Sequence, residues 1–149
     1  MGSVARHRGA VLVLIAWWVF GNLYEAIVVM PWLWRLPPGS LPAEFEPGSP
    51  VFYFVPAGVV MLVLIWTLVF RVRRNGAGPV LRAAVLVTIA AAGTGILVVG
   101  VNPAFRDPAA GVASVHSAVL MWEAGNAVRM ALAVAAAVSL IRRRAGPSD

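Results

Sequence analysis

Residues 112–141 read VASVHSAVLMWEAGNAVRMALAVAAAVSLI, and an arginine triplet at 142–144 ends this run. The run is mostly apolar and exceeds the length of about 20 residues that a bilayer-spanning helix needs. It nevertheless carries Glu123, Asn126 and Arg129 at positions that would lie inside the membrane. Because a charge at that depth costs about 2.5–3.5 kcal/mol, such residues usually face the interior of a bundle and mark function.

The composition of the whole chain is that of an integral membrane protein. Of its 149 residues, 60% are hydrophobic and 12% are charged, whereas soluble domains have about 45–50% apolar and about 25% charged residues. The absence of cysteine excludes disulfides, thiolate metal sites and cysteine nucleophiles. All 12 basic residues are arginines that flank apolar runs, which indicates membrane orientation rather than binding to nucleic acid. The expected surroundings are a lipid bilayer, with no nucleic acid partner.

Four segments are long and apolar enough to span the membrane, and they must be helical because lipid cannot bond a bare backbone. These predicted spans are 9–31, 51–72, 79–101 and 112–141. Residues 32–50 hold five prolines and two glycines, which predicts a loop in place of a helix. The fold class is therefore all-α, a polytopic membrane protein whose single domain, 1–149, is a four-helix bundle. Trp17 and Trp18 are adjacent, so at most one of them can face the bundle interior.

The arginines predict the orientation of the bundle. They gather at one side of the predicted spans: Arg6, Arg8, Arg71, Arg73, Arg74, Arg82 and Arg142–Arg144. The opposite side has only Arg35 and Arg106, partly offset by acidic residues. Because cytoplasmic loops carry the excess of Lys and Arg, we expect both termini in the cytoplasm. A chain rich in Ala, Val and Arg without Lys is typical of high-GC bacterial genomes, so the expected location is the inner (plasma) membrane of a bacterium.

The polar residues of the fourth span follow a pattern. At about 100° per residue, His116 and Glu123 fall within about 20° of each other. Asn126 lies about 60° further round the helix, and Arg129 about 60° beyond that. These four side chains therefore form a slanting stripe along one side of the helix.

The first span carries a matching pair, Asn22 and Glu25, which share a helical face. At 1.5 Å per residue, Glu25 would lie about 8 Å and Glu123 about 16 Å below the outer boundary of the membrane. Asn102 lies at the outer end of the third span. We expect the first and fourth spans to bring their polar side chains together as one cluster.

Such a cluster suits acid–base chemistry. Glu25, Glu123 and His116 are the candidate proton-transfer groups. Arg129 would stabilise an oxyanion, and Asn22, Asn126 and Asn102 would bind substrate. No cofactor is evident, since HExxH and ExxH spacings are absent. One alternative is a metal ion held by Glu25, His116 and Glu123; another is a purely structural pairing of Arg129 with either glutamate.

The arrangement W-x3-N-x2-R, formed by Trp122, Asn126 and Arg129, resembles the signature of the anthrone-oxygenase-like family of small four-helix membrane proteins. The Val29-Met30-Pro31 ending of the first span and the Asn102-Pro103 pair after the third are similar too. The resemblance implies a membrane enzyme that oxidises a hydrophobic aromatic substrate with dioxygen, without an evident organic cofactor. It makes Trp122, Asn126 and Arg129 binding or oxyanion-stabilising residues, whereas Glu25 and Glu123 have no counterpart in that pattern.

The leading hypothesis is an integral membrane enzyme of specialised metabolism that oxidises or rearranges a lipophilic, aromatic or polyketide-type small molecule in an intramembrane polar pocket. One alternative is an acid-initiated cyclase or isomerase of the terpene type. Another is a non-catalytic membrane subunit or small transporter whose charges form a proton relay or a packing ion pair. A bundle of this size can self-associate as a homo-oligomer, although no motif indicates it.

Overall fold

The structure, a computed structural model, describes residues 2–43, 46–47, 49, 51–72 and 77–141. These ranges contain helices and no β-strand. The helices are α1 (Gly2–Tyr24), the π-helical turn η1 (Glu25–Val29), α2 (Met30–Leu33), α3 (Val51–Val72), α4 (Ala77–Gly100), α5 (Asn102–Arg106) and α6 (Val112–Ile141). Four helical segments are long and apolar enough to cross a membrane: Gly2–Leu33, Phe54–Val72, Ala77–Gly100 and Val112–Ile141. The predicted all-α fold with four membrane-spanning helices is confirmed.

The first span is longer than the sequence suggested. Its helix runs without a break from Gly2 to Leu33, because α1, η1 and α2 follow one another directly. The short helix α5 was not expected either; it begins at Asn102, with Pro103 in its first turn where a missing N–H is tolerated. Of the arginines used to predict the orientation, those at 73–74 and 142–144 lie outside the described residues.

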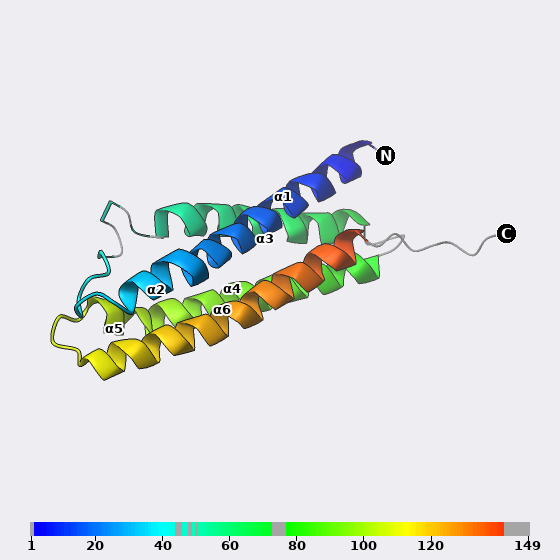
Figure 1. The fold of residues 1–149 in the computed structure, drawn as a ribbon. Helices are drawn as coiled ribbons and strands as arrows, with labels where there is room; N and C mark the ends of the chain where they lie inside the picture. The colour runs from blue at the N-terminus through cyan, green and yellow to red at the C-terminus, as the bar shows by residue number, and fades with distance from the viewer. Residues whose placement is uncertain (1, 44–45, 48, 50, 73–76, 142–149) are drawn as a thin grey trace.

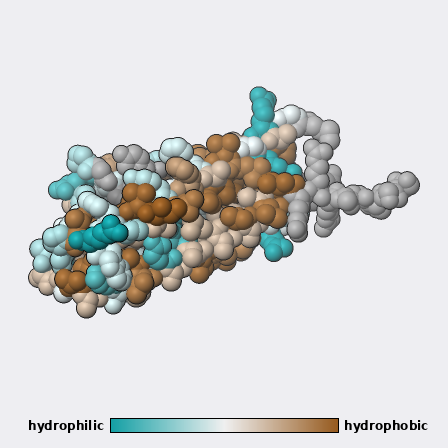
Figure 2. All heavy atoms as spheres, viewed as in Figure 1, coloured by the Kyte–Doolittle hydropathy of each residue, from teal (hydrophilic) through white to brown (hydrophobic). Residues whose placement is uncertain are grey.

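The four long helices form a closed ring of contacts, in which α1 packs against α3 and α6, and α4 also packs against α3 and α6. Figure 1 shows the start of α1 and the end of α6 at one end of the bundle, with the segment after α2 and helix α5 at the other. We call these the terminal end and the loop end. On the face seen in Figure 2, apolar residues dominate the middle of the bundle and hydrophilic residues gather toward its two ends, as a membrane-spanning protein requires.

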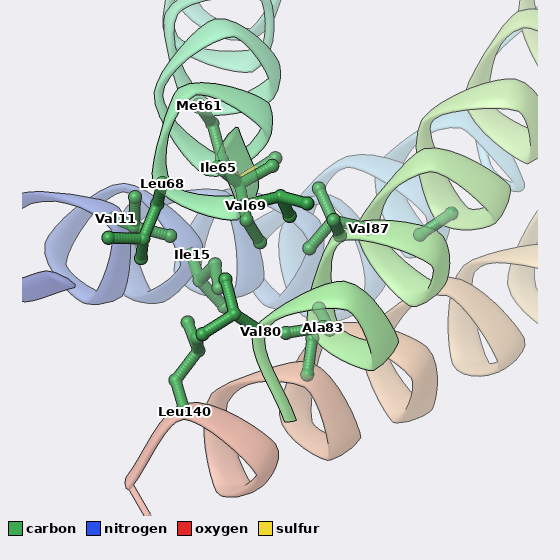
Figure 3. Close-up of a cluster of buried hydrophobic side chains, with 14 of the residues drawn as sticks. Val11, Ile15, Met61, Ile65, Leu68, Val69, Val80, Ala83, Val87 and Leu140 are labelled. Carbon is green, nitrogen blue, oxygen red and sulfur yellow. The ribbon is translucent and has the colours of Figure 1, made fainter. Parts of the chain in front are cut away.

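The terminal half of the bundle has a continuous apolar core. Side chains from all four long helices meet there (Figure 3), among them Val11, Ile15, Met61, Ile65, Leu68, Val80, Val87, Ala133, Ala136 and Leu140. Small residues let α4 and α6 approach closely, since Ala83, Ala90 and Ala136 are fully buried.

The loop half has a second apolar core, to which none of the described side chains of α3 belongs. Its buried members are Met30, Leu33, Leu41, Leu97, Val101, Phe105, Val115, Ala118, Val119 and Trp122, from α2, the segment after it, α4, α5 and α6. In Figure 1 the first turns of α3 stand apart from α2 and α4. The two cores are separated along α1 and α6 by the buried polar residues Asn22, Glu25, Asn126 and Arg129. A polar layer thus crosses the middle of the bundle, beside the place where α3 diverges.

We predict that Ala136→Leu destabilises the bundle by about 1–3 kcal/mol, because the extra heavy atoms Cγ, Cδ1 and Cδ2 cannot fit into the α4–α6 contact without displacing backbone. Unfolding of the purified protein, followed by circular dichroism, measures the change. Ala131→Leu, on the exposed face of the same helix, is the matched control and should leave the stability unchanged. Equal effects of the two substitutions would contradict the packing described here.

Candidate functional site

Asn126 is the centre of the polar layer. It is completely buried, and its Nδ2 donates a 2.7 Å hydrogen bond to the backbone oxygen of Asn22 on α1. Its Oδ1 accepts a 3.0 Å hydrogen bond from Nη2 of Arg129, one turn further along α6. The single amide of Asn126 therefore joins α6 to α1 and also orients the arginine.

The guanidinium of Arg129 is held from two directions. Besides the bond to Asn126, its Nη1 donates a 2.9 Å hydrogen bond to Oγ1 of Thr94 on α4. Its Cζ lies 5.2 Å from the ring centroid of Trp122, a cation–π arrangement. The edge of Phe105 packs on the same indole, with ring centroids 6.3 Å apart and planes at 71°. Arg129 is thus fixed within the bundle, and only 3% of its surface is exposed.

Glu25 approaches this group from α1. It is 5% exposed and begins the π-helical turn, in which the N–H of Met30 bonds to the carbonyl of Glu25, five residues earlier. Pro31 follows directly, and because it has no N–H it cannot complete an ordinary α-helical ladder at this point. Wider turns of this kind are frequent at functional sites. Glu25 interacts electrostatically with Arg129, but no ion pair within 4 Å joins these two residues. The carboxylate of Glu25 is therefore not held in a salt bridge with Arg129.

Two buried N–H donors of the polar layer have no hydrogen-bond partner. They are Nε1 of Trp122 and Nε of Arg129. An unpaired buried donor costs about 1–3 kcal/mol, so proteins seldom retain one without a reason. The Glu25 carboxylate interacts with the indole of Trp122 as a side-chain hydrogen-bond acceptor, although the geometry falls outside the limits of a full hydrogen bond. Both donor nitrogens are enclosed by the surrounding side chains, so an oxygen atom of a bound molecule reaches them only when those side chains shift.

The residues that carry these donors, Trp122 and Arg129, line a small cavity of about 60 Å³, which we call the polar cavity. Its other polar wall residues are Asn22, Glu25, Thr94, Asn102 and Arg106. A volume of this order holds about two water molecules or one polar substituent of a ligand. Because Arg106 has an interaction of its own, we assign the anion-stabilising role to Arg129 and Trp122.

A second, larger cavity of about 630 Å³ adjoins the first, and we call it the aromatic chamber. Its aromatic wall residues are Trp17, Phe20, Tyr24, Trp32 and Phe54, and its one ionisable carboxylate is Glu25. The two cavities share the wall residues Glu25, Val29, Leu41 and Phe54. A volume of this size suits a ligand of several rings.

Of the predicted site residues, the structure gathers Asn22, Glu25, Asn102, Trp122 and Arg129 around the polar cavity. Asn126 lies behind that wall and acts on it through its hydrogen bonds to Asn22 and Arg129.

Glu123 and His116, predicted as proton-transfer groups, line neither the polar cavity nor the aromatic chamber. Glu123 is only partly buried, at the edge of the inner face that Trp122 and Asn126 define, and its carboxylate interacts electrostatically with Glu25. His116 is occupied at the loop end, where its ring stacks on Trp34 with centroids 3.8 Å apart and planes at 2°. Its Nε2 donates a 3.1 Å hydrogen bond to the Trp34 carbonyl.

The structure does not bring Glu25, His116 and Glu123, the residues of the alternative metal site, together as one group of ligands. No group of three or more His, Asp or Glu side chains in the described part of the chain is placed to hold a metal ion. The physical reason is that Trp34 holds His116 at the loop end, whereas Glu25 lies in the polar layer.

Sequence reasoning missed three residues of the site. Thr94 on α4 supports Arg129 with a hydrogen bond. Phe54 on α3 lines both cavities. Leu41 lies in the proline-rich segment and lines both cavities; its N–H donates to the Phe105 carbonyl at 3.2 Å, a long-range contact without a sequence signal.

Comparisons of the chain with protein-family models, with curated proteins and with solved structures find no match. The resemblance to the anthrone-oxygenase-like family therefore stays a prediction that rests on the short motifs of the chain.

We expect Asn126→Ala to destabilise the protein by about 1–2 kcal/mol, because it removes two hydrogen bonds at once and intramembrane bonds average about 0.6 kcal/mol each. Unfolding in mixed detergent micelles measures the loss. Ser139→Ala on the same helix removes only a hydrogen bond to its own helix at Ala135 and should cost less. If both substitutions have the same small effect, Asn126 does not join the helices.

Proposed function

We propose that this protein is a membrane enzyme that oxidises a lipophilic aromatic molecule carrying an acidic C–H or O–H group. The observation that carries the proposal is the pair of buried donors without a full hydrogen bond, Trp122 Nε1 and Arg129 Nε, on residues that line a polar cavity together with Glu25. Donors that are already in place where negative charge develops are the commonest large contribution to catalysis. The adjoining aromatic chamber supplies room for the rings of the substrate.

In the proposed reaction each residue has one role. Glu25 takes the proton from the substrate, and Arg129 and Trp122 bind the oxygen of the resulting enolate or phenolate. Asn126 and Thr94 hold Arg129 in place and are positioning residues. Asn22 and Asn102, as polar wall residues, would orient the substrate oxygen. Glu123 and His116 have no part in this mechanism, since they line neither cavity.

Dioxygen is the proposed oxidant. The substrate anion is electron-rich and adds dioxygen at carbon, and the resulting hydroperoxide loses water. For a methylene group between two aromatic rings, the CH₂ becomes C=O, one oxygen atom stays in the product and the other leaves as water. This balance needs no further reductant or oxidant.

The substrate would reach the site from the bilayer. Trp17, Phe20, Tyr24 and Trp32 line the aromatic chamber and are also between 51% and 67% exposed on the surface of the bundle, at positions that would face lipid. A lipophilic molecule therefore needs no passage through water. We further propose that the protein lies in the inner membrane of a bacterium, where its product enters specialised metabolism.

We predict that Glu25→Gln lowers turnover at least about 100-fold, because removing a proton-transfer group usually costs a factor of 10²–10⁴. Glu123→Gln, the matched control, should keep activity near that of the unchanged protein. The measurement is dioxygen uptake by the protein in lipid nanodiscs supplied with anthrone, together with a melting curve for each variant.

Three outcomes would contradict the proposal. If Glu25→Gln and Glu123→Gln behave alike, the assignment of the base is wrong. Turnover of a lipophilic substrate under strictly anaerobic conditions would favour an acid-initiated cyclase or isomerase. If no variant changes anything except the yield of folded protein, the polar layer is structural.

We also predict that both termini are cytoplasmic, from the arginine distribution. Because the chain has no cysteine, single cysteines report accessibility without background. Ala109→Cys, at the loop end, should react with a membrane-impermeant maleimide in intact cells. Ser3→Cys, at the terminal end, should react only after the membrane is opened; the reverse pattern would invert the proposed orientation.

A further inference from the structure

Phe54 occupies the boundary between the aromatic chamber and the polar cavity. Among the residues of α3 whose side chains the structure describes, it alone lines both, and its side chain is partly buried. The other residues common to both walls come from η1, at Glu25 and Val29, and from the segment after α2, at Leu41. A molecule that moves from the chamber to Arg129 therefore passes between Phe54 and the other three shared wall residues.

The ring of Phe54 lies directly on the backbone of α1 at Gly21. A methyl group built on Gly21 would overlap Cε1 and Cζ of Phe54, so the ring can take this position only because residue 21 has no side chain. Gly21 itself lines the aromatic chamber. This contact bridges α1 and α3 at the level where α3 leaves the apolar core, and it holds the ring across the passage.

The sizes of the two spaces define what the passage admits. The polar cavity, at about 60 Å³, accepts a polar substituent but no ring system, whereas the aromatic chamber, at about 630 Å³, accepts several rings. A substrate must then lie with its rings in the chamber and its oxygen in the cavity. Groups that flank the oxygen have to fit beside Phe54.

We infer that Phe54, seated on Gly21, is a specificity-determining residue that admits aromatic molecules with an unhindered oxygen and rejects those with bulky groups beside it. This inference rests on the proposed function for the site but concerns binding, so it can be tested without turnover. Phe54 sets the width of the passage and takes no part in proton transfer.

Two phenols that share the hydroxyl group but differ in the size of the groups beside it test this inference. 2,6-Dimethylphenol carries small groups beside its oxygen, and 2,6-di-tert-butylphenol carries large ones. Equilibrium dialysis against nanodiscs with and without protein gives the affinity of each phenol beyond its partition into lipid. The unchanged protein should bind the dimethyl compound at least about tenfold more tightly than the di-tert-butyl compound. A modest steric penalty has an effect of this size on affinity.

Phe54→Ala should remove most of this discrimination, because the ring no longer narrows the passage. Phe52→Ala is the matched control: the same substitution two residues earlier on α3, at an exposed side chain that lines neither cavity, should leave the ratio unchanged. Phe54→Leu, a milder change, should give an intermediate ratio and guards against loss of folding in the alanine variant.

Gly21→Ala tests the seat of the ring. Alone it should change the ratio, since the Phe54 ring must move; in the Phe54→Ala background it should have no effect on the ratio, because nothing remains to be displaced. Equal effects of Gly21→Ala in both backgrounds would overturn the inference. So would an unchanged ratio in Phe54→Ala, or no binding of either phenol beyond empty nanodiscs.

The proposed function can fail separately. If the protein takes up no dioxygen with any phenol or aryl ketone, but the ratio responds to Phe54 and Gly21 as expected, the oxidase proposal is wrong and the binding inference stands. If dioxygen uptake is found and the ratio does not respond to Phe54, the binding inference is wrong and the proposed function stands.

Discussion

The burial of Arg129 is the constraint on which the rest of the bundle depends. A guanidinium in the middle of a membrane protein is tolerated only when the protein supplies the partners that water cannot. Asn126 and Thr94 supply two of them, from α6 itself and from α4, and Trp122 supplies an aromatic face. To place these partners, α1, α4 and α6 must meet at one level, and the apolar cores above and below that level keep them there.

The same arrangement leaves two N–H donors and one carboxylate without a full set of partners. Arg129 Nε and Trp122 Nε1 remain without a partner, and Glu25 lies beside them without forming an ion pair. A layer built only for stability would have closed on itself, with the carboxylate bonded to the guanidinium. No ion pair closes the layer, and the layer lies next to a chamber that the divergence of α3 makes accessible from the membrane. These two features favour a binding site over a structural pair.

The sequence predicts much of this because membrane physics restricts the choices. The length of the apolar runs defines four helices, and the position of Asn22, Glu25, Asn126 and Arg129 within them predicts a shared layer. Of the adjacent tryptophans, Trp18 is buried and Trp17 is exposed, as expected from helical geometry. The roles of Glu123 and His116 could not be read in this way. A wheel places Glu123 beside the inner face but cannot say where that face ends, and the stacking of His116 on Trp34 depends on the path of a proline-rich loop.

The central claim is that the polar cavity binds an oxyanion of an aromatic molecule. The most direct measurement is the absorption spectrum of 4-nitrophenol bound to the protein in nanodiscs, because its anion and its neutral form absorb at different wavelengths. The account predicts the spectrum of the anion at a pH where the same phenol in empty nanodiscs is neutral, and loss of that spectrum in Arg129→Gln with the fold retained. A bound phenol that stays neutral, or an anion spectrum that survives Arg129→Gln, would contradict the account.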